Sequence, residues 1–296
     1  MVKKNKKDNI SIRRKFQVSN GYLLEFDQLA RILHFLNSRE RVNKVSREEL
    51  MEETGLANRQ LESLVSVGAA MGIIIPGKQI LSPIGQLIAA HDIFLENPAT
   101  LEWCHYVGAG SYKNLIWFEI FNQVLPENSM SQQSCMEHLR QRLAGQYTDR
   151  TIGKHLYEEV RFVVDAYIER NFKKLELLHL SQDDKLYMRR YSKFEPLILC
   201  AMLYDFGDRT ESRLLQLKTI PETLGSPARI FNIDTNSLRQ LIEQLHQHGW
   251  VRYESTHNLD QIRLLPGYET ISFLKAYFDS TEPIKSKIPQ SEGLFE

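Results

Sequence analysis

The stretch from Ser46 to Gly85 constrains the fold most, because several independent local signals follow one another within it. Ser46 followed by Glu49 forms a capping box and predicts the start of a helix. Gly55 is expected to end that short helix, and Asn58 is expected to cap a second helix with apolar residues at helical spacing. Two helices joined by a tight turn are therefore predicted.

A hairpin is predicted directly after the second helix. Two short apolar runs, 73–75 and 79–81, are separated by a turn at 76–78 that contains proline and glycine. Ser82 and Pro83 are then typical of the N-cap and the first position of a further helix. The order helix, tight turn, helix, β-ribbon and helix is that of a winged helix-turn-helix domain, and the agreement of independent signals favours it.

Such a domain indicates DNA binding. In a helix-turn-helix the second helix meets the major groove through its N-terminal residues, and Arg, Asn and Gln can form paired hydrogen bonds with base edges. The side chains expected to face double-stranded DNA are Arg47, Asn58, Arg59, Gln60 and Ser63, with Lys78 in the wing. The first helix also carries acids that phosphate would repel, namely Glu48, Glu49, Glu52 and Glu53. A winged helix used only for protein packing is therefore the alternative.

Composition limits the partners and the compartment. The 37 basic and 37 acidic residues cancel, so any attraction to nucleic acid must be local. The 3 cysteines stand far apart without the spacing of a metal or redox motif, which predicts reduced thiols in a cytoplasmic protein. No apolar run approaches the ~20 residues of a membrane span, so no membrane partner is expected. No metal and no cofactor are expected either.

Residues 1–15 are rich in lysine and arginine and contain a single acid, Asp8. With almost no apolar content before Ile10, they predict a disordered basic arm. The arm could bind phosphates beside the winged helix, or it could serve only to keep the terminus in solution. Both interpretations stay open at this point.

A basic stripe is predicted on one helix of the middle region. This helix is expected to be capped by Thr148, to run to about Glu169, and to carry its apolar residues along one side. At 100° per residue, three cations fall within about 40° of one another on a different face. They are Arg150, Lys154 and Arg161. Such a stripe could hold a phosphate backbone, although it is more commonly a solvated face with neighbouring acids, for which Glu158 and Glu169 are available.

The C-terminal region repeats the opening architecture in weaker form. Asp234 predicts a helix cap, Gly249 ends that helix, and strands are expected at 250–255 and 261–265 around a turn at 257–258. The predicted fold class is therefore mainly α, with an N-terminal winged helix-turn-helix, a helical middle domain and a C-terminal winged-helix-like α+β domain. The predicted parts are the arm at 1–15, the winged helix at 16–90, the middle domain at 91–195, the C-terminal domain at 196–278 and a flexible tail at 279–296.

Ordered motifs along nearly the whole chain add a family resemblance. They lie at 81–85, 95–101 with His105, 117–122, 151–167 and 225–231. Their succession resembles the family of domains of unknown function numbered four thousand and seven, although Ala228 stands where a glycine is expected. The resemblance implies bacterial proteins from gene clusters that modify or defend DNA. Many lie beside enzymes of phosphorothioation, in which sulfur replaces a non-bridging phosphate oxygen, and some are SspB-like components implicated in DNA nicking. It implies no residue-by-residue catalytic motif.

A DNA-nicking enzyme needs a nucleophile or clustered carboxylates that hold Mg²⁺. Asp183-Asp184-Lys185 places an acid two residues before a lysine, with Asp165 or Glu169 as the upstream partner. Chance placement of such a triplet in a surface loop is the commoner explanation. We therefore expect a DNA-binding component of a modification or defence system. The alternatives are a Mg²⁺-dependent nicking subunit and a winged-helix scaffold that binds other proteins of the same gene cluster.

Overall fold

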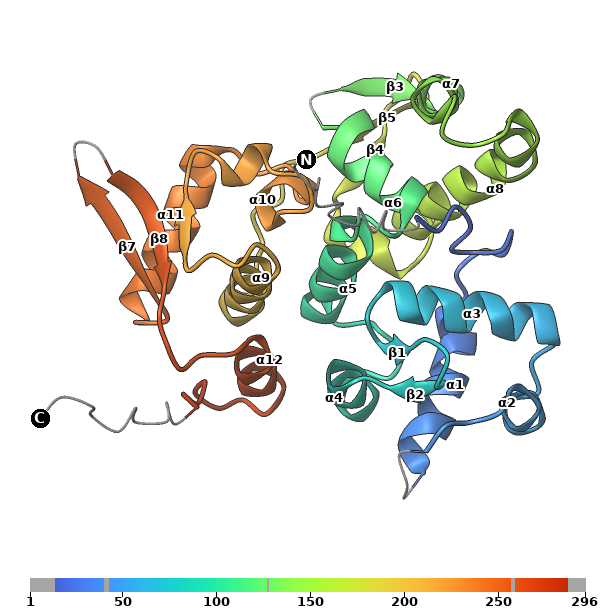
Figure 1. Cartoon of the computed structure of the whole chain (residues 1–296), viewed down its shortest axis with the longest axis horizontal. Helices are drawn as coiled ribbons and strands as arrows, with labels where there is room; N and C mark the ends of the chain where they lie inside the picture. The colour runs from blue at the N-terminus through green and yellow to red at the C-terminus, as the bar shows by residue number, and fades with distance from the viewer. Residues whose placement is uncertain (1–13, 40–42, 127, 257–258, 287–296) are drawn as a thin grey trace, which may run out of the picture.

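The computed structural model describes residues 14–39, 43–126, 128–256 and 259–286. Within these ranges the chain is mainly helical, with three small antiparallel sheets set among the helices (Figure 1). The C-terminal elements occupy the left of the view, the N-terminal and middle elements occupy the right, and α5 (Pro98–Gly110) lies near the centre. The coarse prediction of a mainly α protein is confirmed.

Local capping explains where the N-terminal helices begin and end. The Ser46 hydroxyl accepts a hydrogen bond from the Glu49 N–H at 3.1 Å, and Gly55 ends the helix with a φ of 67°. The Ser82 hydroxyl likewise accepts from the Gly85 N–H at 2.9 Å. The elements of this part are α1 (Phe26–Ser38), α2 (Arg47–Thr54), α3 (Asn58–Ala70), β1 (Ile74–Ile75), β2 (Ile80–Leu81) and α4 (Pro83–His91).

The predicted hairpin after α3 is present and short. Its register places Ile74 opposite Leu81. One detail of the prediction was wrong, because Ala57 precedes α3 and no side chain caps that helix. Asn58 lies inside the first turn, where its side-chain oxygen is 3.4 Å from an Arg47 guanidinium nitrogen and is therefore engaged elsewhere.

The middle part is less uniformly helical than predicted. A sheet in the order β3–β5–β4 lies beside α7 and α8 (Figure 1). β3 pairs with β5 although α7 and α8 lie between the two strands in the sequence, so this sheet joins segments that are far apart along the chain. Thr148 caps α8 as predicted. The elements after α5 are α6 (Leu115–Glu119), the π turn η1 (Ile120–Val124), β3 (Ser129–Ser131), α7 (Gln132–Leu143), α8 (Asp149–Ile168), the 3-10 turn η2 (Asn171–Leu175), β4 (Leu178–Leu180) and β5 (Lys185–Met188).

The C-terminal part combines helices with a sheet in the order β6–β8–β7. Asp234 caps α11 as predicted, its carboxylate accepting from the Ser237 N–H at 2.9 Å. β7 and β8 lie within two residues of the predicted strands, and the predicted turn at 257–258 lies outside the described residues. Ala228 is buried in a short helix, so this position does not require a glycine. The elements are α9 (Pro196–Arg209), β6 (Leu214–Gln216), η3 (Ile220–Glu222), α10 (Pro227–Ile230), α11 (Thr235–Gln247), β7 (Val251–Thr256), β8 (Leu259–Leu264) and α12 (Thr270–Phe278).

One contiguous hydrophobic core joins these parts. Buried side chains from Phe16 before α1 to Leu274 in α12 belong to the same cluster. α5 is buried along most of its length and contacts α6, α9 and α10. α12 contacts both α9 and α4, which connects the C-terminal part to the N-terminal helices. The predicted boundaries near 90 and 195 stay predictions, since they fall within this shared core.

None of the described helices combines the length and the apolarity that crossing a bilayer requires. α8 reaches 20 residues, close to the ~20 that a membrane span needs, but charged residues interrupt it throughout. One face of α8 packs against the core along the length of the helix, and the opposite face is polar.

A buried hydrogen-bond network lies at the centre of the core. His105 Nε2 is 3.0 Å from the Ile230 carbonyl oxygen, which can only accept, so Nε2 carries the proton. Nδ1 is then the acceptor for the Tyr167 hydroxyl, and that hydroxyl accepts from the Trp117 indole at 3.0 Å. Burial lowers the pKa of His105 to about 3. The neutral ring therefore joins α5, α8 and α10 without a charge.

α5 also buries a carboxyl group, that of Glu102, which is 1% exposed. The Tyr191 hydroxyl donates to it at 2.6 Å and the Glu195 backbone N–H at 3.3 Å. Burial raises the pKa of Glu102 to about 8, despite the opposite effect of these two hydrogen bonds. At neutral pH the folded protein therefore holds a proton that the unfolded chain releases.

We expect the proton on Glu102 to make stability fall as the pH rises. Between the ordinary value of 4.5 and the folded pKa of about 8, its contribution falls by up to about 1.4 kcal/mol per pH unit, because the folded state binds more protons. Glu102→Gln removes this titration. Urea unfolding from about pH 6 to about pH 8 should show the free energy of wild type decreasing relative to that of the variant. A constant difference would contradict a protonated Glu102.

Candidate nucleic-acid interface

The first turn of α3 is exposed, as expected for a helix that reads DNA, but it offers little free positive charge. Arg59 is exposed and, within the described ranges, forms no ion pair. Arg47, at the start of α2, forms an ion pair with Glu62 of α3 and also approaches Asn58. The positive charge of Arg47 is thus compensated by an acid of the same protein. Arg59 is the cation that this turn presents to solvent.

Two predicted DNA-facing residues of α3 are turned inward. Ser63 is 2% exposed, and its hydroxyl donates to the Ser19 carbonyl oxygen at 2.5 Å. Gln60 is half-buried and its side chain bonds that of Gln28 on α1. The prediction that Ser63 faces DNA was therefore wrong, because the segment before α1 covers this side of α3. Gln60 is accessible only in part.

Lys78 is exposed in the turn between β1 and β2, as predicted. Its backbone carbonyl accepts from the Val45 N–H at 3.1 Å, which holds the turn against the chain before α2. α2 itself presents the exposed acids Glu48, Glu52 and Glu53. The surface formed by α2, α3 and the hairpin therefore has mixed sign, which is unfavourable for binding to phosphate alone.

The basic stripe of α8, defined by Arg150, Lys154 and Arg161, lies in solvent. All three side chains are exposed, and among the described residues none of them forms an ion pair or a side-chain hydrogen bond. The stripe extends over about 16 Å at 1.5 Å per residue. Sequence reasoning missed Tyr157, which lies between Lys154 and Arg161 and is 55% exposed. Its spacing of three and four residues from those cations is the signal that could have found it.

Glu159 determines which side of α8 faces inward. It lies nine residues after Arg150, about 180° around the helix. Its carboxylate accepts from the Val18 N–H at 3.0 Å, the Ser19 N–H at 3.1 Å and the Ser19 hydroxyl at 2.8 Å. Burial raises the pKa of Glu159, and these hydrogen bonds together with Lys15 act against that rise. Sequence reasoning missed this residue, although an acid within an apolar helix face is a recognisable signal.

The predicted basic arm is only partly described, since residues 1–13 lie outside the described ranges. Its last two residues belong to the folded protein. Arg14 forms an ion pair with Glu119 at 2.8 Å and lies over the Tyr112 ring. Lys15 Nζ donates to the Ser66 hydroxyl at 2.6 Å. The prediction of disorder was wrong for these two cations, because Glu119 of α6 and Ser66 of α3 hold them.

The acids considered for a nicking site are not gathered into a metal site. Asp183 and Asp184 are exposed in the turn between β4 and β5. Asp165 accepts a hydrogen bond from the Arg170 guanidinium at 3.0 Å and is thereby neutralised. Across the described part of the chain, no three His, Cys, Asp or Glu residues are grouped so that they could hold a metal ion. The predicted acid cluster is therefore not formed.

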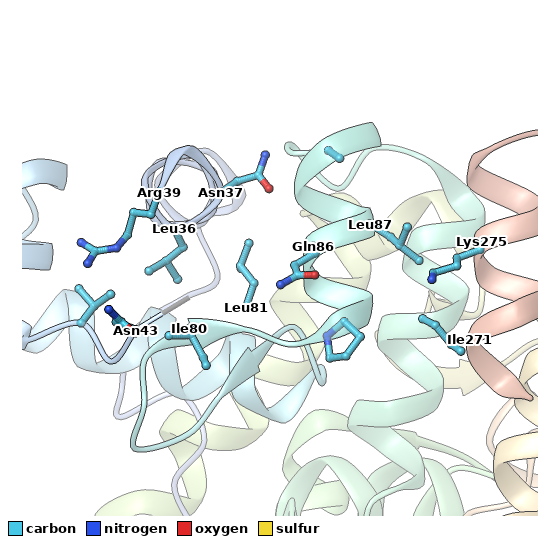
Figure 2. A pocket seen from close by; sticks show the side chains of 13 residues that line it. Leu36, Asn37, Arg39, Asn43, Ile80, Leu81, Gln86, Leu87, Ile271 and Lys275 are labelled. Carbon is cyan, nitrogen blue, oxygen red and sulfur yellow. The ribbon is translucent and has the colours of Figure 1, made fainter. Parts of the chain in front are cut away.

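A groove of about 420 Å³ lies where α1, β2, α4 and α12 meet (Figure 2). Leucines from the N-terminal elements, among them Leu36, Leu81 and Leu87, make its lining largely apolar. Arg39 and Lys275 lie at its opposite ends (Figure 2). Among the described residues that line it there is no acid, histidine or cysteine. The groove lies at the packing seam between α4 and α12.

Fold and surface together define a mainly helical protein whose longest described helix presents uncompensated cations. The sequence matches a family described as proteins of unknown function, DUF4007, across residues 29–278. The chain belongs to this family. A comparison with curated proteins finds no match.

Solved structures of SspB share the fold. Two crystal structures, one of SspB and one of magnesium ion-bound SspB, each align with a TM-score of 0.69 over 88% of this chain and 87% of the SspB chain. Sequence identity is 11% in both cases, so the likeness concerns the fold. The residues that the present structure describes contain no group of three His, Cys, Asp or Glu side chains that could hold a metal ion.

We expect Glu159 to be important for stability. Glu159→Ala leaves two backbone N–H groups and the Ser19 hydroxyl without their acceptor, so the free energy of unfolding should fall by about 1–3 kcal/mol. Glu158→Ala is the control, because Glu158 is the exposed neighbour on the same helix and should change it by less than about 0.5 kcal/mol. Urea unfolding measures both. Equal effects of the two substitutions would show that the Glu159 contact is dispensable.

Proposed function

We propose that this protein is a DNA-binding component of a bacterial DNA modification or defence system linked to phosphorothioation. The α8 stripe would hold double-stranded DNA through its phosphates. The carrying observation is that Arg150, Lys154 and Arg161 are exposed on one face and lack carboxylate partners among the described residues. Duplex affinity depends chiefly on neutralising phosphates, and free cations in a row provide that neutralisation.

The surface of α3 has a secondary role in this proposal. The order α2, α3, β1, β2, α4 supports a winged helix-turn-helix in which α3 is the reading helix and the β1–β2 hairpin is the wing. Because Arg47 is paired with Glu62, Arg59 and Lys78 are the cations left to contact DNA. These two would add base or backbone contacts to an affinity that comes mainly from α8.

Family membership and the fold support the biological setting. The chain belongs to DUF4007 and shares its fold with SspB. The family resemblance implies gene clusters of DNA phosphorothioation, so the DNA bound would be that of such a system. Whether a phosphorothioate strengthens binding is decided by titrating the same duplex with and without the sulfur.

Replacing the stripe should reduce the salt dependence of DNA binding. The triple variant Arg150→Gln, Lys154→Gln, Arg161→Gln removes three phosphate contacts. The slope of log affinity against log salt should therefore fall by about 2 to 3. Fluorescence anisotropy with a labelled duplex, from about 50 to about 200 mM salt, measures this slope.

A matched control removes three exposed cations that already have carboxylate partners. Lys193 pairs with Glu176, Arg213 with Asp208 and Arg252 with Glu254, and all three are changed to glutamine. This control carries the same change in net charge and should leave the slope nearly unchanged. An equal loss in both triple variants, or no duplex binding by wild type at low salt, would refute the proposal.

Arg59→Ala tests the reading role of α3. Loss of one paired contact to a base should weaken binding to the preferred duplex by about 1–3 kcal/mol and reduce the preference among sequences. Arg47→Ala is the comparison, because Arg47 is already paired with Glu62 and should affect DNA less. Anisotropy against a small panel of duplexes measures both effects. If Arg47→Ala weakens binding more, α3 does not read DNA through Arg59.

The acidic surface of α2 favours a second candidate function, a scaffold for other proteins of the same gene cluster. Glu48, Glu52 and Glu53 are exposed together there. Nuclease-resistant co-purification with neighbouring gene products, lost when all three acids become glutamine, would support it. A nicking role is tested in parallel with supercoiled plasmid with and without Mg²⁺, since one SspB structure holds that ion.

A further inference from the structure

An exposed tyrosine lies within the row of cations on α8. Tyr157 is 55% exposed and follows Arg150 by seven residues, so the two lie within about 20° of each other around the helix. Lys154 precedes it by three residues and Arg161 follows it by four, which makes both of them its neighbours on the helix surface. The ring therefore has a cation on either side of it along the helix and is reachable from solvent.

The space beside this ring is a groove of about 330 Å³ between α7 and α8. Gly153 lies one helical turn before Tyr157, and a Cβ placed on it would meet no atom within 4 Å. A side chain would fit at this position, and its absence leaves the approach to the tyrosine face open. Leu156 and Met136 contribute apolar groups to the same groove. A flat, partly apolar ligand could therefore lie against the ring.

The charges around the groove favour an anionic ligand. Arg140 of α7 lines it, and the stripe lies on α8 next to the groove, where Tyr157 belongs to both. One carboxylate, that of Glu137, also lines it, and this group accepts a hydrogen bond from the Gln133 amide at 3.3 Å. Glu158 lies beside the stripe, with His155 Nδ1 at 4.0 Å from its carboxylate. Counted together with the stripe, four exposed cations stand against three exposed carboxylates, those of Glu137, Glu158 and Asp149.

A nucleic acid strand offers both groups that this surface could bind: a planar base for the tyrosine ring and flanking phosphates for the cations. In an intact duplex the faces of the bases are stacked on one another, so a protein ring can reach a base only where it is unpaired. The stripe extends over about 16 Å, roughly the rise of five stacked nucleotides at about 3.4 Å each. That length suits a short single-stranded stretch with one base at the tyrosine.

We propose that the α7–α8 groove binds an unpaired nucleotide, whose base stacks on Tyr157 while Arg150, Lys154 and Arg161 hold the neighbouring phosphates. This inference rests on the proposed function, and it adds a preference for single-stranded or locally opened DNA over intact duplex. Tyrosine supplies the stacking face, and the hydroxyl is not required. Phenylalanine should therefore replace it and alanine should not.

The experiment uses the full-length protein with Tyr157→Ala and Tyr157→Phe. Probes are a single strand, its duplex, and the duplex with one unpaired 2-aminopurine, whose fluorescence falls when the base stacks. Tyr157→Ala should weaken binding to the single strand and the bulged duplex by about 5- to 100-fold, and change intact-duplex affinity less than about twofold. Tyr157→Phe should bind like wild type, and the quenching should disappear in the alanine variant alone.

The outcomes separate this inference from the proposed function. If the stripe variants lose duplex binding but Tyr157→Ala changes neither affinity nor quenching, the stacking site is refuted and the proposed function stands. Equal losses for duplex and single strand in Tyr157→Ala also refute stacking. If poly-glutamate displaced the oligonucleotide at the same concentration of charge, the stacking site would be refuted and the groove would be a site for an acidic protein. Absence of any nucleic acid binding by wild type refutes both.

Discussion

The carboxylate of Glu159 is the contact on which the arrangement of α8 and α3 depends. It accepts from the backbone N–H groups of Val18 and Ser19 in the segment before α1. The carbonyl groups of the same two residues accept from the hydroxyls of Ser66 and Ser63 on α3. Buried backbone groups without partners cost about 1–3 kcal/mol each. The segment therefore fixes α8 and α3 to each other, and it decides which face each helix presents.

This arrangement separates charge locally in a chain that has none overall. With 37 basic and 37 acidic residues, the protein carries no net charge that would attract a polyanion. Arg47 of α2 is compensated by Glu62 of α3, and α2 also presents exposed acids. The buried acid of α8, Glu159, bonds the backbone of the N-terminal segment, and the outward cations of the helix are unpaired within the described ranges. The face of α8 that carries these cations points to solvent, and the local potential there is positive.

Local chemistry allowed the helix starts and the hairpins to be predicted. Ser46, Ser82, Thr148 and Asp234 all cap the helices expected of them, because a cap depends on residues within three positions. The sheet β3–β5–β4 could not be predicted, since its strands are short and β3 pairs with a segment beyond two helices. The burial of Ser63 could not be predicted for the same reason, because its hydrogen-bond partner Ser19 is distant in the sequence. The shared face of the α8 cations was predictable, since it follows from helical period alone.

Because the imidazole of His105 is uncharged, the contact that it makes between two parts of the molecule does not depend on salt. Its ring links Tyr167 of α8 to the Ile230 carbonyl in the C-terminal part through hydrogen bonds that involve no ion. Dissolved salt weakens attraction between exposed charges but hardly affects neutral bonds buried in a core. The joint between the two halves of the molecule is therefore insensitive to ionic strength, whereas the outer face of α8 is not. If α8 holds DNA as proposed, rising salt would release the DNA while the internal geometry of the protein stays as it is.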